Sequence, residues 1–199
     1  MTLYEFAMRF AAPVLRFLLG VRVEGAQRVP DGPLVLCANH RSNFDPVILG
    51  SSCPRQLFYM AKAELFHVPL LGPLITALGA FPVRRGEGDT EAIKTSLRVL
   101  KRGNVLGMFP EMHRNRNKTG LMRFHSGALR FAAQAKVPIM PVAIVRGKGV
   151  WPFRQVRVVF GYPVTAEMLG FEKENRKSHT AACENLRQKV LQMLEEKST

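Results

Sequence analysis

The stretch NHRSNFD, residues 39–45, joins two apolar runs and carries side chains that could move a proton. His40 and Asp45 lie five residues apart in it. On a helix that step would turn the two side chains about 140° away from each other. They can therefore meet only if the chain between them makes a tight turn, and Ser42 and Asn43 are residue types that favour one.

If the two side chains meet, Asp45 accepts a hydrogen bond from one imidazole nitrogen of His40 and leaves the other nitrogen free to take a proton. The reference pKa of histidine is about 6.5, so an imidazole held in this way is a competent general base at neutral pH. A structural alternative stays open, because Asp45 followed by Pro46 is also the pattern of a helix N-cap with proline at the first helical position. One carboxylate oxygen could cap the helix while the other holds His40.

Two further polar clusters follow apolar runs, at residues 84–89 and 110–118. The guanidinium groups of Arg84 and Arg85 suit a phosphate monoester, although neighbouring strand residues point to opposite faces, so one of the two is expected to reach a given ligand. In the second cluster Arg114 could close over the same anion, and Glu111 could fix an arginine or accept from a hydroxyl group. A solvated basic surface is the alternative for these arginines.

Metal ligation is not expected, because no HExxH pattern or paired-carboxylate spacing occurs and His113 and His125 are twelve residues apart. The three cysteines are widely spaced, which favours buried thiols in a reducing compartment over a disulfide framework.

Strands and helices are predicted to alternate along the chain, which indicates an α/β fold with a mainly parallel central sheet flanked by helices. In such sheets the chemistry gathers at the carboxyl ends of the strands, where the polar clusters fall. The predicted strands are 21–24, 34–38, 57–61, 80–84, 105–109, 138–145 and 155–160. The predicted helices are 3–19, one from about 46, 70–78, 90–102 between Asp89 and Gly103, 126–136 and 178–196.

The first 20 residues are predicted to form an amphipathic helix ahead of a domain that spans 21–199. Glu5, Arg9 and Arg16 share one narrow stripe of this helix, and apolar residues at helical spacing occupy the other side. Such a helix could pack on the domain or lie in a membrane interface, and we favour the interface because the apolar face is wide and aromatic-rich.

A second apolar stretch, residues 65–83, is interrupted by three prolines and two glycines, so it is predicted to form a short helix and a buried strand and not a transmembrane span.

The composition implies an anionic partner. The chain has 199 residues, 29 Lys and Arg against 15 Asp and Glu, and a formal net charge of +14. Nucleic acid, anionic lipid and a phosphorylated substrate all fit that charge. A nucleic-acid-binding domain is disfavoured because the aromatic residues lie in apolar segments and no binding motif is present.

In this order the clusters resemble the glycerolipid acyltransferase family typified by 1-acyl-glycerol-3-phosphate acyltransferases. NHRSNFD is similar to the NHxxxxD block of that family, and AFPVRRG to its second block. FPEMHR is similar to its third block, which usually reads FPEGTR, and VPIMPVAI to its fourth. The resemblance covers roughly residues 20–165.

The resemblance implies that His40, oriented by Asp45, deprotonates the free hydroxyl of 1-acyl-glycerol-3-phosphate, which then attacks an acyl thioester directly and gives phosphatidic acid. It implies that the acceptor phosphate is held by Arg84 or Arg85 together with Glu111 and Arg114. Four further candidates for substrate binding follow from the same resemblance: Asn39, Gly86, His113 and Pro141.

The co-substrate implied is acyl-CoA or acyl carrier protein, with no cofactor and no metal. The lysophospholipid acceptor and an anionic membrane surface are the expected partners, and nucleic acid is not. The expected location is the cytoplasmic face of the cell membrane, as a peripheral or monotopic protein.

One departure from the family pattern concerns the acceptor. Met112 and His113 stand where the family usually has Gly-Thr. Glycine allows a positive φ angle or a close backbone approach, which methionine disfavours, and the imidazole could be a second donor to phosphate. The same chemistry on another lysophospholipid or an amino-lipid is therefore an alternative. A non-catalytic protein that binds anionic lipid is the alternative from another class, and it would not need His40.

Overall fold

The computed structural model describes residues 1–84, 89–117, 120–147, 155–172 and 175–196. Within them the strands form one seven-stranded sheet with the order β1-β7-β6-β2-β5-β3-β4. The strands are β1 (Val21–Glu24), β2 (Leu34–Ala38), β3 (Leu57–Lys62), β4 (Ala80–Val83), β5 (Val105–Met108), β6 (Ile139–Arg146) and β7 (Val156–Phe160). Every neighbouring pair is parallel except β6 and β7, which run antiparallel. The predicted α/β fold with a mainly parallel sheet is confirmed.

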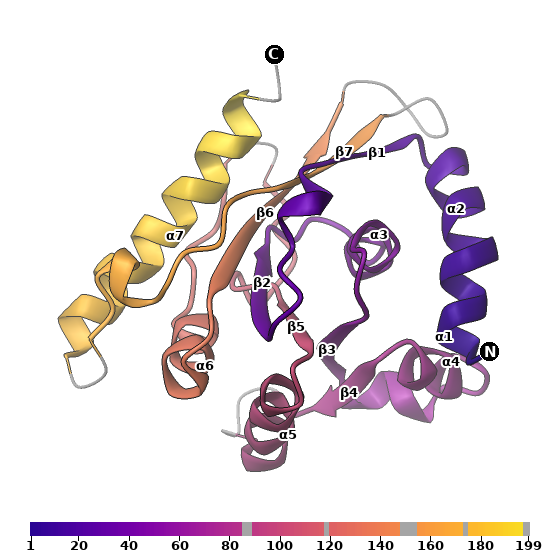
Figure 1. The fold of residues 1–199 in the computed structure, drawn as a ribbon, viewed down its shortest axis with the longest axis horizontal. Helices are drawn as coiled ribbons and strands as arrows, with labels where there is room; N and C mark the ends of the chain where they lie inside the picture. The colour runs from indigo at the N-terminus through magenta and orange to yellow at the C-terminus, as the bar shows by residue number, and fades with distance from the viewer. Residues whose placement is uncertain (85–88, 118–119, 148–154, 173–174, 197–199) are drawn as a thin grey trace.

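Helices cover both faces of this sheet (Figure 1). The helices are α1 (Leu3–Phe6), α2 (Ala12–Leu18), α3 (Asp45–Ser52), α4 (Leu71–Ala77), α5 (Thr90–Lys101), α6 (Gly127–Ala135) and α7 (Arg176–Glu196), with a π-helical turn at Ala7–Ala11 that joins α1 to α2. Short 3-10 turns at Ala26–Arg28, Ala63–His67 and Glu167–Leu169 were not predicted. The predicted bounds of the strands and of the helices after residue 20 agree with these within about two residues.

Alternate residues of the central strands face two different halves of the core. In β2, Val35 and Cys37 pack with residues of α5, α6 and α7, while Leu34, Leu36 and Ala38 pack with residues of α3. All five side chains are buried. Strands buried on both faces read as continuous apolar runs, and residues 34–38 have that character. The two-residue alternation therefore fixes which half of the core each residue of β2 faces.

The residues predicted to begin and end α5 do so in the structure. Asp89 caps the helix, since its side chain accepts hydrogen bonds from the backbone N–H groups of Glu91 and Ala92 at 3.1 and 3.0 Å. Gly103 follows the helix with a φ angle of 79°, a conformation that glycine adopts without the penalty of a side chain.

The segment 65–83 differs in one respect from its prediction. It contains α4 and β4, as expected, but β4 lies at the edge of the sheet and its Pro82 is exposed. Proline cannot donate to a strand ladder, so the edge is where a strand with this sequence fits. Among the described residues, none of the helices is long and apolar enough to cross a membrane.

The apolar stripe of the N-terminal helical segment is about half exposed. Leu3, Phe6, Phe10, Val14 and Leu18 each expose between 48 and 57% of their surface. The segment contacts α3 and β1 while this stripe is only about half exposed, so packing on the domain and insertion into lipid both stay predictions.

The buried face against α3 yields a test of the core. Leu36→Ala removes a fully buried side chain from β2 and should lower the free energy of unfolding by about 2–5 kcal/mol, measured by chemical denaturation. Met168→Ala, at a side chain that is 71% exposed, is the matched control and should change it by less than about 0.5 kcal/mol. Equal effects of the two variants would contradict this assignment of the core.

Candidate active site

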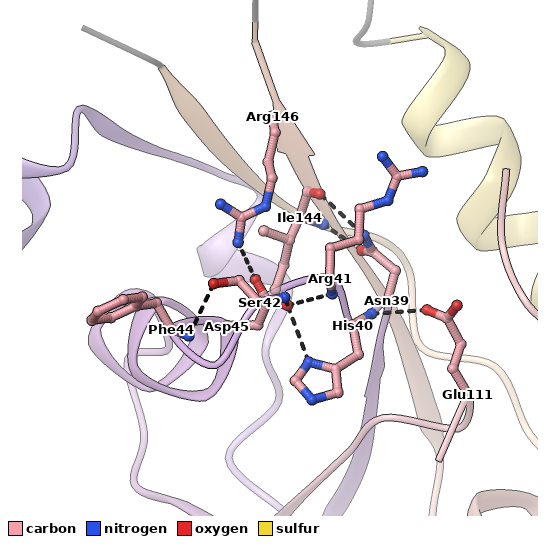
Figure 2. A network of polar contacts seen from close by, with 9 residues as sticks. All are labelled: Asn39, His40, Arg41, Ser42, Phe44, Asp45, Glu111, Ile144 and Arg146. Atoms are coloured by element: carbon pink, nitrogen blue, oxygen red, sulfur yellow. Dashed lines mark hydrogen bonds and ion pairs between the residues drawn. The ribbon is translucent and has the colours of Figure 1, made fainter. Parts of the chain in front are cut away.

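The residues with catalytic chemistry gather at the carboxyl end of β2, between the ends of β5 and β6. β2 ends at Ala38, and α3 begins at Asp45. The intervening loop turns sharply enough that the Nδ1 atom of His40 lies 3.0 Å from the Oδ2 atom of Asp45 (Figure 2). The predicted contact between these two side chains is present.

Asp45 forms this contact as a buried anion, not as a helix cap. Its Oδ2 atom also accepts hydrogen bonds from the backbone N–H groups of Arg41 and Ser42, both at 2.6 Å, while its Oδ1 atom pairs with the guanidinium of Arg146. No side chain caps the N-terminus of α3. The N-cap alternative is therefore wrong: the carboxylate bonds to the loop that precedes the helix. Asp45 has an exposed fraction of 0%.

The partners of Asp45 keep it ionised. Burial by itself would raise the pKa of this carboxyl group. The hydrogen bond from His40, the N–H of Ser42, the charge of Arg146 and the N–H of Arg41 outweigh the burial and hold the pKa below its usual range. An ionised Asp45 accepts the Nδ1 proton of a neutral imidazole and so leaves Nε2 unprotonated.

The imidazole is held in place on its flat side as well. The ring of His40 stacks on Phe109 with centroids 4.3 Å apart and an angle of 26° between the planes. None of the described residues donates or accepts a hydrogen bond at Nε2. The side chain of His40 is 12% exposed, so the imidazole is largely shielded from bulk water.

Glu111 fixes the main chain on which His40 sits. Its two oxygens accept from the backbone N–H groups of His40 at 2.8 Å and of Met122 at 2.9 Å, and the carbonyl of His40 accepts from the N–H of Asn115 at 2.7 Å. Glu111 is 1% exposed. Both oxygens thus shape the loop that carries His40, and the predicted role of Glu111 at the acceptor phosphate stays a prediction.

Two further candidates are also structural. The side-chain amide of Asn39 donates to the carbonyl of Ile144 at 3.1 Å and accepts from its N–H at 2.7 Å, which joins the end of β2 to β6. Pro141 lies inside β6, paired with Cys37. Both residues are buried, and their binding of substrate stays a prediction.

The predicted phosphate ligands lie on the surface around this centre. Arg84, Arg114 and His113 are exposed and available to an anion. Arg84 follows β4, which is three strands from β2, or about 14 Å at the usual strand spacing. Arg85 and Gly86 lie outside the described residues. Phosphate binding by the described arginines stays a prediction.

Sequence analysis missed Arg146. It is the first charged residue after the apolar run 137–145, so the signal that singled out the other clusters, a polar residue directly after a buried strand, also applies to it.

Met112 takes up the backbone conformation that was expected to need glycine. Its φ angle is +60°, and its N–H donates to the carbonyl of Phe109 at 3.0 Å. Methionine disfavours a positive φ, but the turn holds Met112 in that conformation. The surrounding hydrogen bonds hold the turn, and the side chain of Met112 is 43% exposed.

A buried carboxylate that orients a histidine at the carboxyl edge of a parallel sheet is an arrangement suited to general-base catalysis. Residues 20–145 match the model of the family described as Acyltransferase. The chain belongs to this acyltransferase family.

Relatives of known name extend the comparison. The chain is 30% identical over 167 residues to the 1-acyl-sn-glycerol-3-phosphate acyltransferase of Bacillus subtilis, with 81% of this chain and 82% of the relative covered. It is 38% identical over 125 residues to the lyso-ornithine lipid O-acyltransferase of Pseudomonas aeruginosa, which covers 62% of this chain and 46% of the relative.

Among solved structures, the 1-acyl-sn-glycerophosphate acyltransferase PlsC from Thermotoga maritima has the same fold. The match has a TM-score of 0.74 and 23% sequence identity, and covers 97% of this chain and 78% of that one.

The turn at Met112 gives a pair of opposite substitutions. Met112→Gly relieves the positive φ and should leave the free energy of unfolding unchanged or raise it by up to about 1 kcal/mol. Met112→Val places a β-branched residue at the same φ and should lower it by about 1–3 kcal/mol. Thermal unfolding of both variants checks the difference, and a Val variant as stable as the Gly variant would show that the positive φ is not retained in solution.

Proposed function

We propose that this protein transfers a fatty acyl group from an acyl thioester to the free sn-2 hydroxyl of 1-acyl-sn-glycerol-3-phosphate and so forms phosphatidic acid. The observation that carries the proposal is the His40–Asp45 pair, with the imidazole Nε2 left open by the described residues. The relative from Bacillus subtilis, matched over most of both chains, supports the choice of acceptor.

In this reaction Nε2 of His40 takes the proton of the acceptor hydroxyl as the oxygen attacks the thioester carbonyl. Collapse of the tetrahedral intermediate breaks the carbon–sulfur bond, and the imidazolium returns the proton to the departing thiolate. Asp45 holds the imidazole throughout and stabilises its protonated form. The thioester, of coenzyme A or of acyl carrier protein, is the co-substrate, and the steps need no further cofactor.

Direct transfer agrees with the state of the cysteines. Cys37, Cys53 and Cys183 are all buried. Burial raises the pKa of each thiol, which disfavours the reactive thiolate. A covalent acyl-cysteine intermediate is therefore not part of the proposal.

An apolar cavity of about 540 Å³ suits an acyl chain. The N-terminal helical segment lines it with residues that include Phe10 and Leu15, α3 with Pro46 and Val47, and β3 with Tyr59. Pro46 directly follows Asp45, so the cavity reaches the helix that begins at the catalytic pair. Burial of an acyl chain beside the reacting groups would position the thioester or the lysolipid for transfer.

Membrane association is part of the same proposal, because the acceptor is a lipid. The apolar stripe of the N-terminal segment is about half exposed. Leu70, at the turn before α4, is 88% exposed, and Leu74, within α4, is 45% exposed. Leu70 has a φ angle of +65°, so an apolar residue is held at an exposed turn in spite of a strained backbone. These side chains, with the net charge of +14, fit a peripheral or monotopic protein on an anionic leaflet at the cytoplasmic face.

A second acceptor is supported by two observations. Met112 and His113 are both exposed where the family pattern has Gly-Thr, and the Pseudomonas aeruginosa relative is named for an acceptor other than lysophosphatidic acid. A lyso-ornithine lipid is therefore the acceptor to compare with lysophosphatidic acid.

The reaction is tested by acyl transfer from labelled acyl-CoA and, in parallel, from acyl carrier protein thioester. Lysophosphatidic acid, glycerol 3-phosphate, lysophosphatidylcholine and lyso-ornithine lipid are the acceptors. Wild type should acylate lysophosphatidic acid, and His40→Ala should lose about 10²–10⁴-fold in rate because the general base is gone.

His125→Ala, at an exposed histidine, is the matched control and should stay within about twofold of wild type. Transfer to another acceptor alone would replace the proposed substrate. An active His40→Ala variant would overturn the mechanism.

Membrane association is tested separately by flotation with vesicles that contain phosphatidylglycerol. The double variant Phe6→Ser, Phe10→Ser should bind about tenfold or more weakly, because two exposed aromatic side chains no longer enter the interface. Met168→Ser, on the turn that packs against α7, serves as the control and should bind like wild type. Equal binding of all three proteins would remove the N-terminal segment from the membrane contact.

A further inference from the structure

Arg146 reaches the catalytic pair from a distant part of the chain. It is the last residue of β6 and lies 101 residues after Asp45, whose Oδ1 atom it contacts through Nη2. Figure 2 shows its guanidinium above the carboxylate, on the side away from the imidazole. Asp45 therefore lies between a permanent cation and His40.

The strand is aligned so that Arg146 can do this. Asn39, the residue before His40, holds both backbone groups of Ile144. Arg146 follows Ile144 by two residues and so points to the same side of β6, the side that α3 covers. The side chain of Arg146 is 16% exposed, so most of it is enclosed beside Asp45.

This arrangement sets two cations in competition for one carboxylate. An imidazolium at position 40 gains from the charge of Asp45 and loses from that of Arg146. Without Arg146, the buried carboxylate would be balanced chiefly by drawing a proton onto His40. The protonated imidazole cannot accept a proton from a hydroxyl group.

We infer that Arg146 is a positioning residue that holds Asp45 in line with His40 and keeps the imidazole in its unprotonated, base-competent form at neutral pH. The inference rests on the proposed function for its consequence in catalysis, but the state of His40 can be measured without substrate.

Other charged groups near His40 are bound in ways that leave this role to Arg146. Arg41 directs Nη2 to the carbonyl of Gly120 at 2.9 Å. Glu111 meets the backbone N–H of His40, and its charge also acts on Arg187 of α7. The charged groups to be considered around His40 are thus Asp45 from α3, Arg146 from β6, Glu111 after β5, Arg187 from α7 and Arg41 on its own loop, beside the exposed His113 and Arg114.

The experiment compares Arg146→Gln and Arg146→Lys with wild type, and uses Arg98→Gln, at an exposed arginine of α5, as the matched control. The dependence of kcat/KM on pH is measured in detergent, with KM and kcat resolved for both substrates. In parallel, the titration of His40 is followed by NMR of protein labelled at histidine, with the signal assigned by its loss in His40→Ala. Thermal unfolding at each pH shows that the variants are folded.

For Arg146→Gln we expect the acidic limb of the pH profile and the NMR midpoint of His40 to move upward by about one pH unit, a tenfold change in the protonation equilibrium. The rate should fall about tenfold below pH 6.5 and recover towards pH 9, with KM changed less than about twofold. Arg146→Lys should restore most of the wild-type profile, and Arg98→Gln should not alter it.

Three results would overturn the inference: an unmoved NMR midpoint, a rate loss that is the same at every pH, or a raised KM with an unmoved acidic limb, which would make Arg146 a substrate contact. The proposed function is tested independently of these three results. A shifted His40 midpoint in a protein that acylates none of the acceptors would sustain the inference about Arg146 and reject the reaction.

Discussion

The carboxylate of Asp45 is the group on which the site depends. It is fully buried, and a buried charge is costly unless it is paired and hydrogen-bonded. Its partners come from three places: the imidazole of His40, the N–H groups of Arg41 and Ser42, and the guanidinium of Arg146. Because each of them lowers the same penalty, the turn after β2, the start of α3 and the end of β6 are stabilised together. The catalytic geometry is thus a consequence of burying one ionised group where the sheet ends.

A second buried carboxylate completes the placement of His40 through the backbone. Glu111 accepts from the N–H of His40, and Asn115 donates to its carbonyl. Asp45 and Phe109 fix the ring, so both the main chain and the side chain of His40 are held. A general base is most effective when the fold already holds it in its reactive position before substrate binds. The residues after β5 therefore hold the main chain of His40, a role of Glu111 that neither the residue pattern nor the family resemblance indicated.

The sequence predicted the elements well because their signals are local. Continuous apolar runs marked the central strands, and Asp89 and Gly103 marked the ends of α5. It predicted the contact of His40 with Asp45 because five residues can be joined by one turn. It could not predict Arg146 beside Asp45 or Asn39 beside Ile144, since those pairs are 101 and 105 residues apart and depend on the order of strands in the sheet. At Met112 a rule based on residue type failed, because the turn around it overrides the preference of methionine.

The environment of the N-terminal segment could not be predicted from its sequence, because an apolar helical stripe has the same pattern whether it contacts protein or lipid. In the structure this stripe is about half exposed, and most of its residues also line the cavity against α3. The same short helix that would enter the lipid also forms one wall of the cavity that leads to Pro46. If Phe6 and Phe10 enter the bilayer as proposed, the side of the cavity that they line lies at the depth of the lipid acyl chains. A lysolipid could then pass from the leaflet towards His40 without exposing its chain to water, which would otherwise cost about 0.8 kcal/mol for each methylene group.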